Sequence, residues 1–225
     1  LSPHLGPLPY DATKDLVAVA SVMYSPVLLA ATSAFGQGDF KTLIQRGRAQ
    51  PDALRWATSG NGSLGHLMLE NIRSTAQVRI THVPYKGGGQ QITDALSGQF
   101  EVLSTNASGA ALQHIKEGRL RALAVGASAR LDALPGVPTL SELGFASANF
   151  SSHFGLFAPA GVPAAIIDKL NAQTNAVLAL PVLRERMLSA ECVAAPMSVN
   201  EFGKFVLNEH RHMAAIVREA RIQSD

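Results

Sequence analysis

Residues 58–66 read TSGNGSLGH, which places three glycines and two serine hydroxyls directly before a helical pattern. A short strand, Leu54–Thr58, precedes this loop, and Ser63 stands at the N-cap position of the helix that follows it. The inward face of that helix is predicted to consist of Leu64, Leu67, Met68 and Ile72, which recur at helical spacing. The stretch is therefore a strand-loop-helix unit with exposed backbone amides at the helix start.

The same unit recurs along the next sixty residues. Strands are predicted at 78–83, 100–105 and 120–125, with helices ending at 96 and spanning 110–117 between them. Strands separated by single helices indicate right-handed β-α-β units and a parallel sheet. The loops at 59–62, 84–89 and 106–109 would then emerge at the carboxyl edge of the sheet, where open α/β sheets bind ligands.

The flanking segments follow other patterns. Residues 16–35 carry no charge, but their polar residues and Pro26 favour two buried strands over a membrane helix. Residues 1–4 do not resemble a signal peptide, and the absence of an initiating Met suggests a processed or trimmed chain. Thr139 and Glu142 predict a capping box and a short helix ending at Gly144.

The C-terminal third is predicted to hold a strand at 154–158 and helices beginning at Pro163 and Pro181. Ser198 and Glu201 form a second capping box before a long final helix. The inward face of the helix at Pro163 is predicted to contain Ile166, Ile167, Leu170, Val177 and Leu178.

Composition excludes several classes of protein. The 225 residues are 47% hydrophobic and 16% charged, which is typical of a globular chain. A net charge of +2 with scattered basic residues argues against a nucleic-acid partner. The single cysteine, Cys192, excludes an internal disulfide and a multi-cysteine metal site.

Residues 60–65 match the G-x-G-x-x-G pattern of dinucleotide-binding folds. Such folds need a carboxylate at the end of the second strand to bind the ribose, but here that strand ends in Pro84, Tyr85 and Lys86. The first strand, 54–57, also looks too polar for the buried centre of such a sheet. A nicotinamide-dependent oxidoreductase is therefore an alternative rather than the main hypothesis.

Hydrolysis and metal binding fit less well. Residues 61–65 differ by one glycine from a G-x-S-x-G nucleophile elbow, and the available partners would be His153 and Asp168, the latter inside a predicted helix. His210 and His212 stand two apart on a helix and would point to different faces. We expect no catalytic residues, no metal and no cofactor.

Anion binding accounts for the remaining features. Ser59, Asn61 and Ser63 supply side-chain donors, and a helix start supplies backbone amides and a favourable dipole. Tyr85 and the amides of residues 87–89 form a second such opening one strand away. The alternative is that both loops are simply capped turns, and His66 suits a ligand-facing role or a packed, capping role equally well.

Several separated motifs in this order resemble the periplasmic solute-binding proteins of tripartite tricarboxylate transporters, the Bordetella uptake gene type of extracytoplasmic solute receptor. The resemblance covers nearly the whole chain, through Leu8–Asp11 with Lys14 and Asp15, Ser59–Ser63 with His66, His82–Gly87, Gly118–Val125, Leu134–Thr139 and Gly155–Gly161.

The resemblance implies an α/β, two-lobed type II periplasmic binding protein, a Venus flytrap, that delivers a small carboxylate to membrane permease subunits. We expect a periplasmic monomer, with lobe 1 at 1–23 and 149–225 and lobe 2 at 24–148. Family members begin earlier, so the N-terminal part of lobe 1 is expected to be missing here. His153 stands where an aromatic residue, commonly Trp, is usual.

Closure of the lobes would bring residues of both onto one ligand. The predicted ligand-binding residues are Ser59, Gly60, Asn61, Gly62, Ser63, His66, Tyr85, Lys86, Gly87, Gly88, Asn106, His153 and Phe154. Lys86 is the only lysine or arginine in the candidate loops, which favours a small dicarboxylate or an amino acid; a tricarboxylate or an aromatic acid also remains open. A ligand sensor or adaptor for a membrane signalling protein is a further alternative.

Overall fold

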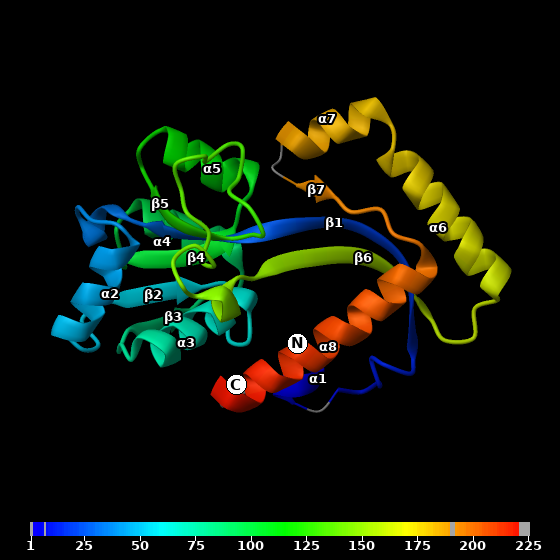
Figure 1. The fold of residues 1–225 in the computed structure, drawn as a ribbon, viewed down its shortest axis with the longest axis horizontal. Coiled ribbons are helices and arrows are strands. Elements are labelled where there is room, and N and C mark those ends of the chain that lie inside the picture. Colours follow the sequence, from blue (N-terminus) through cyan, green and yellow to red (C-terminus); the bar gives the residue numbers. More distant parts are fainter. Residues whose placement is uncertain (1, 7, 190–191, 221–225) are drawn as a thin grey trace. The chain divides into compact units, whose positions relative to one another are not determined.

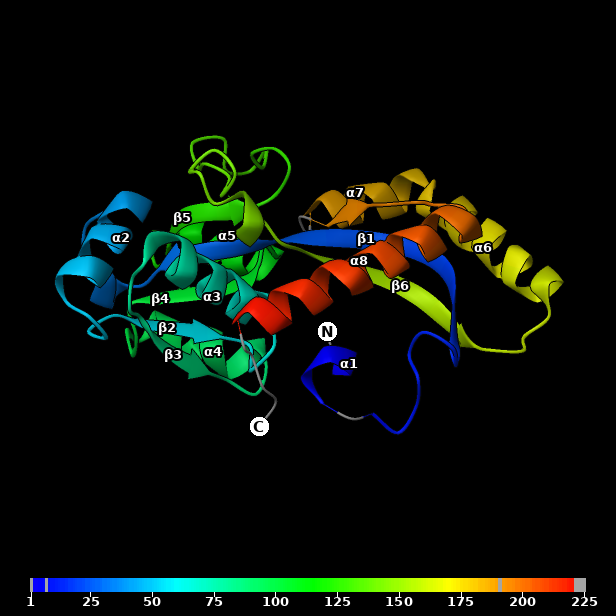
Figure 2. The ribbon, with the colours of Figure 1, turned by 60° about the horizontal axis from the view of Figure 1, so that its bottom comes forward.

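The computed structural model describes residues 2–6, 8–189 and 192–220. Backbone contacts divide the chain into two compact units. Unit 1 contains described residues within 2–25 and 153–220, and unit 2 contains residues 26–152. Two paired strands, β1 (Leu16–Ala31) and β6 (Ser151–Pro159), each continue from one unit into the other, as Figures 1 and 2 show.

Unit 2 is built on a mixed sheet with the strand order β3-β2-β4-β1-β5. The further strands are β2 (Arg55–Thr58), β3 (Thr81–Pro84), β4 (Val102–Asn106) and β5 (Arg121–Gly126). β2 is parallel to β3 and β4, as the sequence predicts, but β1 runs antiparallel between β4 and β5. The prediction of an all-parallel sheet was therefore wrong. The β-α-β rhythm sets the direction of β2 to β5 but does not specify which strand is inserted between them.

The uncharged segment at 16–35 forms one 16-residue strand, so the prediction of two strands divided at Pro26 was wrong. Pro26 does not interrupt the strand because it lies between two sets of partners. The ladders with β4 and β5 begin at Val27, whereas the ladder with β7 (Val193–Ala194) covers Met23 and Tyr24. The Pro26 carbonyl oxygen still accepts a hydrogen bond from the Ala107 amide at 2.8 Å. The missing N–H of proline therefore falls where neither of these ladders needs it.

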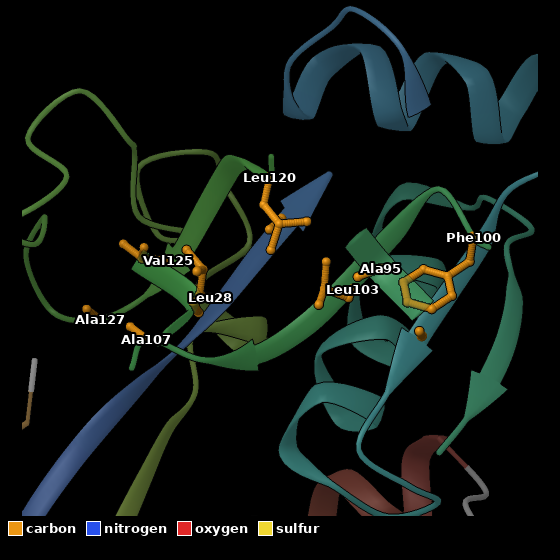
Figure 3. Packing of buried hydrophobic residues seen from close by; sticks show 11 residues of the cluster. Leu28, Ala95, Phe100, Leu103, Ala107, Leu120, Val125 and Ala127 are labelled. Carbon is orange, nitrogen blue, oxygen red and sulfur yellow. The ribbon is translucent and has the colours of Figure 1, made fainter. Parts of the chain in front are cut away.

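Four helices accompany this sheet: α2 (Phe40–Ala49), α3 (Leu64–Ala76), α4 (Gly88–Leu96) and α5 (Gly109–Lys116). Two short 3-10 turns, η1 (Ser33–Phe35) and η2 (Ala146–Ala148), complete the unit. Its core includes Leu28 of β1, Leu103 of β4 and Val125 of β5, which pack in one cluster (Figure 3). Three of the four residues predicted to face inward on α3, Leu67, Met68 and Ile72, are fully buried, whereas Leu64 at the helix start is only partly buried.

The Thr139–Glu142 capping box forms, but no helix follows it. The Thr139 amide donates to Glu142 Oε2 at 2.7 Å and the Glu142 amide donates to Thr139 Oγ1 at 3.1 Å. The segment to Gly144 is a turn, so the predicted short helix is wrong. The amides of Leu143, Gly144 and Phe145 donate to carbonyl oxygens four, three and five residues back, so the hydrogen bonds do not form a regular helical ladder.

Unit 1 contains α1 (Ser2–Leu5), α6 (Ala164–Leu178), α7 (Pro181–Ser189), β7 and α8 (Val199–Ala220). The capping box of Ser198 and Glu201 is present at the start of α8. On α6, Ile167 and Leu178 are 5% and 4% exposed, whereas Ile166, Leu170 and Val177 are 45–49% exposed. The prediction that all five point inward was therefore wrong for those three, because no described residue covers that side of α6.

Among the described residues, no helix combines the length and apolar character that a bilayer crossing requires.

Candidate functional site

Three loops lie at the carboxyl ends of three adjacent parallel strands of unit 2. Residues 59–63 connect β2 to α3, residues 85–87 connect β3 to α4, and residues 107–108 connect β4 to α5. The register places β2 between β3 and β4. Three helix N-termini therefore follow the same edge of the sheet, and the partial positive charge of each helix dipole is at that end.

The first loop is shaped by a serine cap and two glycines. Ser63 Oγ accepts a hydrogen bond from the His66 amide at 3.2 Å, and the Ser63 amide donates to the Gly60 carbonyl oxygen at 3.2 Å. Gly60 and Gly62 have φ values of 139° and 68°, which favour glycine. Ser63 is thus a confirmed N-cap, and the loop requires glycine at both positions.

The backbone amides around this cap are partly unoccupied. Within the described part of the chain, the amides of Asn61, Leu64 and Gly65 donate no hydrogen bond to another protein group. Free amides in the first turn are the ordinary consequence of helix geometry. They are also the donors with which helix starts bind anions.

The second loop is joined to the first by main-chain hydrogen bonds. The Tyr85 amide donates to the Thr58 carbonyl oxygen at 3.0 Å, and the Gly87 amide donates to the Ser59 carbonyl oxygen at 3.2 Å. A Cβ atom on Gly60 would lie 3.1 Å from the Tyr85 carbonyl oxygen. The two glycine-rich loops therefore form one continuous backbone structure.

Gly87 begins α4 with φ 103° and, being glycine, offers no side-chain cap. Among the described residues, the amides of Gly88 and Gly89 have no hydrogen-bond acceptor. Lys86 is exposed beside them and is the only lysine or arginine in the three loops. The start of α4 thus supplies further donors and one positive charge.

The Tyr85 side chain is engaged within the protein. Its hydroxyl donates to Asp94 Oδ2 at 2.8 Å, and its ring packs edge-on against Phe100 with centroids 5.8 Å apart. Burial and the neighbouring Asp94 carboxylate raise the pKa of Tyr85 to about 12. The phenol therefore stays neutral and fixes the loop, and its backbone is the part that faces the adjoining loop.

In the third loop, Ser108 caps α5 through a 3.5 Å hydrogen bond from the Ala111 amide. Asn106 Oδ1 accepts a hydrogen bond from Ser152 Oγ at 2.8 Å. Asn106, the last residue of β4, lies at the same sheet edge as the first two loops, and its side chain is held by Ser152, 46 residues further along the chain.

The His66 ring is held on two sides. Nδ1 accepts a hydrogen bond from the Gly62 amide at 3.0 Å, and Nε2 lies 3.6 Å from Glu70 Oε1. The ring stacks on His82 with centroids 4.0 Å apart and planes at 17°. Both nitrogens therefore face protein groups.

Beneath the loops lies a buried polar cluster that sequence reasoning missed. Trp56 Nε1 donates to Ser104 Oγ at 3.0 Å, and Gln91 Nε2 donates to the Ser104 carbonyl oxygen at 3.0 Å. Gly65 of α3 packs directly against Ser104. This cluster links α3, α4, β2 and β4. The available signal was Gln91 itself, a polar residue on the otherwise apolar face of α4.

The cluster also corrects the judgement that strand 54–57 is too polar for a buried position. Trp56 and Ala57 are fully buried in β2, between β3 and β4. The indole N–H can be buried because the Ser104 hydroxyl accepts it.

His153 and Phe154 belong to unit 1, on β6. His153 is exposed and lies 4.3 Å from Phe205 and 5.6 Å from Tyr24, between ring centroids, and Phe154 is 41% exposed. Their membership in one site with the unit 2 loops stays a prediction. Within unit 2, the structure brings the loops at Ser59, Tyr85 and Asn106 to one sheet edge.

A comparison with protein families assigns this chain to one of them. Residues 1–222 match the model of the tripartite tricarboxylate transporter family receptor. The chain belongs to this family. Among curated proteins it is similar to a UPF0065 protein of Bordetella bronchiseptica, with 33% identity over 96% of this chain and 60% of the relative. It is also similar to BugT of Bordetella pertussis, with 31% identity over 94% of this chain and 65% of the relative. The chain thus spans 60–65% of the length of these relatives.

Solved structures agree with the family assignment. Rpa4515 of R. palustris, solved with adipate, superposes with a TM-score of 0.87 at 28% identity over 99% of this chain and 75% of that one. MatC of Rhodopseudomonas palustris, solved with malate, superposes with a TM-score of 0.83 at 28% identity over 95% and 74%. The fold of this receptor-family chain is accordingly the α/β fold of two-lobed periplasmic binding proteins.

Proposed function

We propose that this receptor-family chain is part of a periplasmic solute-binding protein that captures a small carboxylate with the loops of unit 2. The observation that carries the proposal is the backbone junction of the first two loops. Through it, the starts of α3 and α4 present free amides from one continuous structure. Charge-assisted hydrogen bonds from such amides suit a carboxylate.

The number of charged groups narrows the ligand class. With Lys86 as the single cation in the loops, binding depends mostly on neutral donors and helix dipoles. Small dicarboxylates suit this arrangement better than highly charged anions do. The adipate and malate in the two Rhodopseudomonas proteins are such ligands.

The proposed role in the cell is capture and delivery without turnover. The delivered ligand would pass to membrane permease subunits, the partners that the family description implies. His153 and Phe154 would contact the same ligand from unit 1. The assignment of His153 and Phe154 to the ligand site rests on the sequence resemblance.

The decisive experiment is calorimetric titration of the 225-residue chain with adipate, malate, succinate, citrate and glutamate, with NADH as a control. We expect saturable binding of at least one dicarboxylate and none of NADH. Binding of NADH without binding of any carboxylate would contradict the proposal.

A further inference from the structure

His66 is joined to the first loop by a hydrogen bond from the loop backbone to its ring. The buried Gly62 amide donates to His66 Nδ1 at 3.0 Å, four residues ahead on the first turn of α3. The Gly62 amide thus has a side-chain acceptor, and Gly62 itself has a φ of 68°. The shape of residues 59–63 is tied to the chemical state of this imidazole.

The hydrogen bond determines which nitrogen carries the proton. An imidazole nitrogen that accepts a hydrogen bond must be unprotonated, so neutral His66 carries its proton on Nε2. Nε2 faces Glu70 Oε1 at 3.6 Å, which suits a donor. A second proton, on Nδ1, would direct an N–H group at the N–H group of Gly62.

Charged and titratable groups from two elements, α3 and β3, surround the His66 ring. Glu70, on the same helix, places its Oε1 atom 3.6 Å from His66 Nε2, and Arg73 forms an ion pair with the same carboxylate. Burial alone would raise the pKa of Glu70, but His66 and Arg73 outweigh it and hold the pKa below its ordinary value, so Glu70 is a carboxylate. On the other face, β3 supplies His82, whose Nε2 lies 2.7 Å from Thr58 Oγ1.

We propose that His66 is a positioning residue whose neutral, Nε2-protonated imidazole holds the Gly62 amide, so that protonation of His66 loosens the loop and releases the ligand. The effect on ligand affinity rests on the proposed function, whereas the effect on the loop does not. A cationic His66 would also attract an anion electrostatically. The proposal requires the loss of loop shape to exceed that attraction.

Two variants separate the hydrogen bond from the charge. His66→Asn places an amide oxygen near the position of Nδ1 and cannot be protonated, while His66→Phe keeps the stacking ring but has no acceptor. His82→Gln keeps a polar group near the Nε2 position of His82 and serves as the control for the second imidazole of the stacked pair. Adipate is the probe, titrated from about pH 8 to about pH 6, the range in which imidazoles ordinarily change charge.

For the wild type, we expect adipate affinity to fall on the order of tenfold on acidification, as for a lost hydrogen bond to a binding loop. His66→Asn should keep the high-pH affinity and flatten the profile, and His82→Gln should retain the wild-type profile. His66→Phe should bind weakly at every pH. A wild-type affinity that rises on acidification, or a His66→Asn profile like the wild type, would overturn the proposal.

Measurements without ligand make the test independent of carboxylate binding. Nitrogen-resolved NMR of the histidine rings should show His66 protonated at Nε2 at about pH 8. Hydrogen exchange of the Gly62 amide should be faster in His66→Phe than in His66→Asn. If adipate binds to no variant, the proposed ligand is wrong, yet an Nδ1-protonated His66 or equal Gly62 exchange would still refute the positioning role.

Discussion

The Gly87 amide donates to the Ser59 carbonyl oxygen across 3.2 Å and joins the loop after β3 to the loop after β2. Two helix starts that are separate in sequence therefore depend on one another. Gly60 lies at this junction, since any side chain on it would meet the Tyr85 carbonyl oxygen. The junction explains why a change in one loop is expected to reach both helix starts.

Gly60→Ala should weaken ligand binding and stability together. At φ 139° an alanine is strained, at about 1–3 kcal/mol, and its Cβ would lie 3.1 Å from the Tyr85 carbonyl oxygen. Gly136→Ala is the control, because that glycine has neither a positive φ nor a neighbour within 4 Å of the added Cβ. Thermal melts and adipate titration of both variants test this. Equal behaviour of the two variants would show that the junction is tolerant.

Ser63→Asp should lower carboxylate affinity while the fold is retained. Aspartate caps helices as well as serine does, so the melting temperature should change little. Its negative charge would oppose a ligand carboxylate at the same helix start, and about 1.4 kcal/mol of repulsion already corresponds to tenfold in affinity. Calorimetry with the dicarboxylate panel measures the loss, and Ser63→Thr is the uncharged control. Unchanged affinity in Ser63→Asp would favour a cap without an anion site.

Gly65→Ala should destabilise unit 2. The added Cβ would lie 2.9 Å from Ser104 Cβ and would also crowd the hydroxyl that accepts the Trp56 hydrogen bond. Overpacking of this kind costs about 1–3 kcal/mol. Gly203→Ala, in α8, is the matched control because its Cβ meets nothing within 4 Å, and it should be stabilised by up to about 1 kcal/mol.

Denaturant unfolding measures both free energies, and fluorescence of Trp56, the only tryptophan, reports on the site of the first substitution. If Gly65→Ala left the free energy of unfolding unchanged, α3 would be able to move away from β4 at little cost.

Alkaline titration should reveal the late ionisation of Tyr85. The chain has three tyrosines, and the pKa of Tyr85 is raised to about 12 by burial and by the Asp94 carboxylate. A raised pKa favours the protonated phenol in the folded state. The stability it contributes is therefore complete below the ordinary value of about 10 and is lost as the pH rises through about 12. Ultraviolet titration should lose its last step in Tyr85→Phe, and an unchanged last step would contradict the assignment.

The local units of this fold were readable from the sequence because their determinants lie within a few residues. Ser63 and the apolar positions Leu67, Met68 and Ile72 specify α3, and Ser198 with Glu201 specifies the start of α8. The parallel direction of β2, β3 and β4 follows from their alternation with single helices. The proximity of the loops at Ser59, Tyr85 and Asn106 follows from the same alternation.

Other features were decided by contacts between residues distant in sequence. The insertion of β1 between β4 and β5 depends on which strand edges are free, and local periodicity does not encode that choice. Pro26 is tolerated inside β1 because two different sets of strands pair on either side of it. The buried Trp56 depends on Ser104, which lies 48 residues away.

The sequence by itself determined the strand-loop-helix units and the free amides at their helix starts, because capping and glycine conformations are local. Tertiary structure alone decided how those amides are arranged, since the hydrogen bond from Gly87 to Ser59 and the contact of Gly65 with Ser104 join separate segments. It also decided the surroundings of His66: the ring nitrogens face Gly62 and Glu70 within its own segment, but its stacking partner, His82, comes from the next strand. Hydrogen bonding and packing at this range depend on the whole of unit 2 being folded.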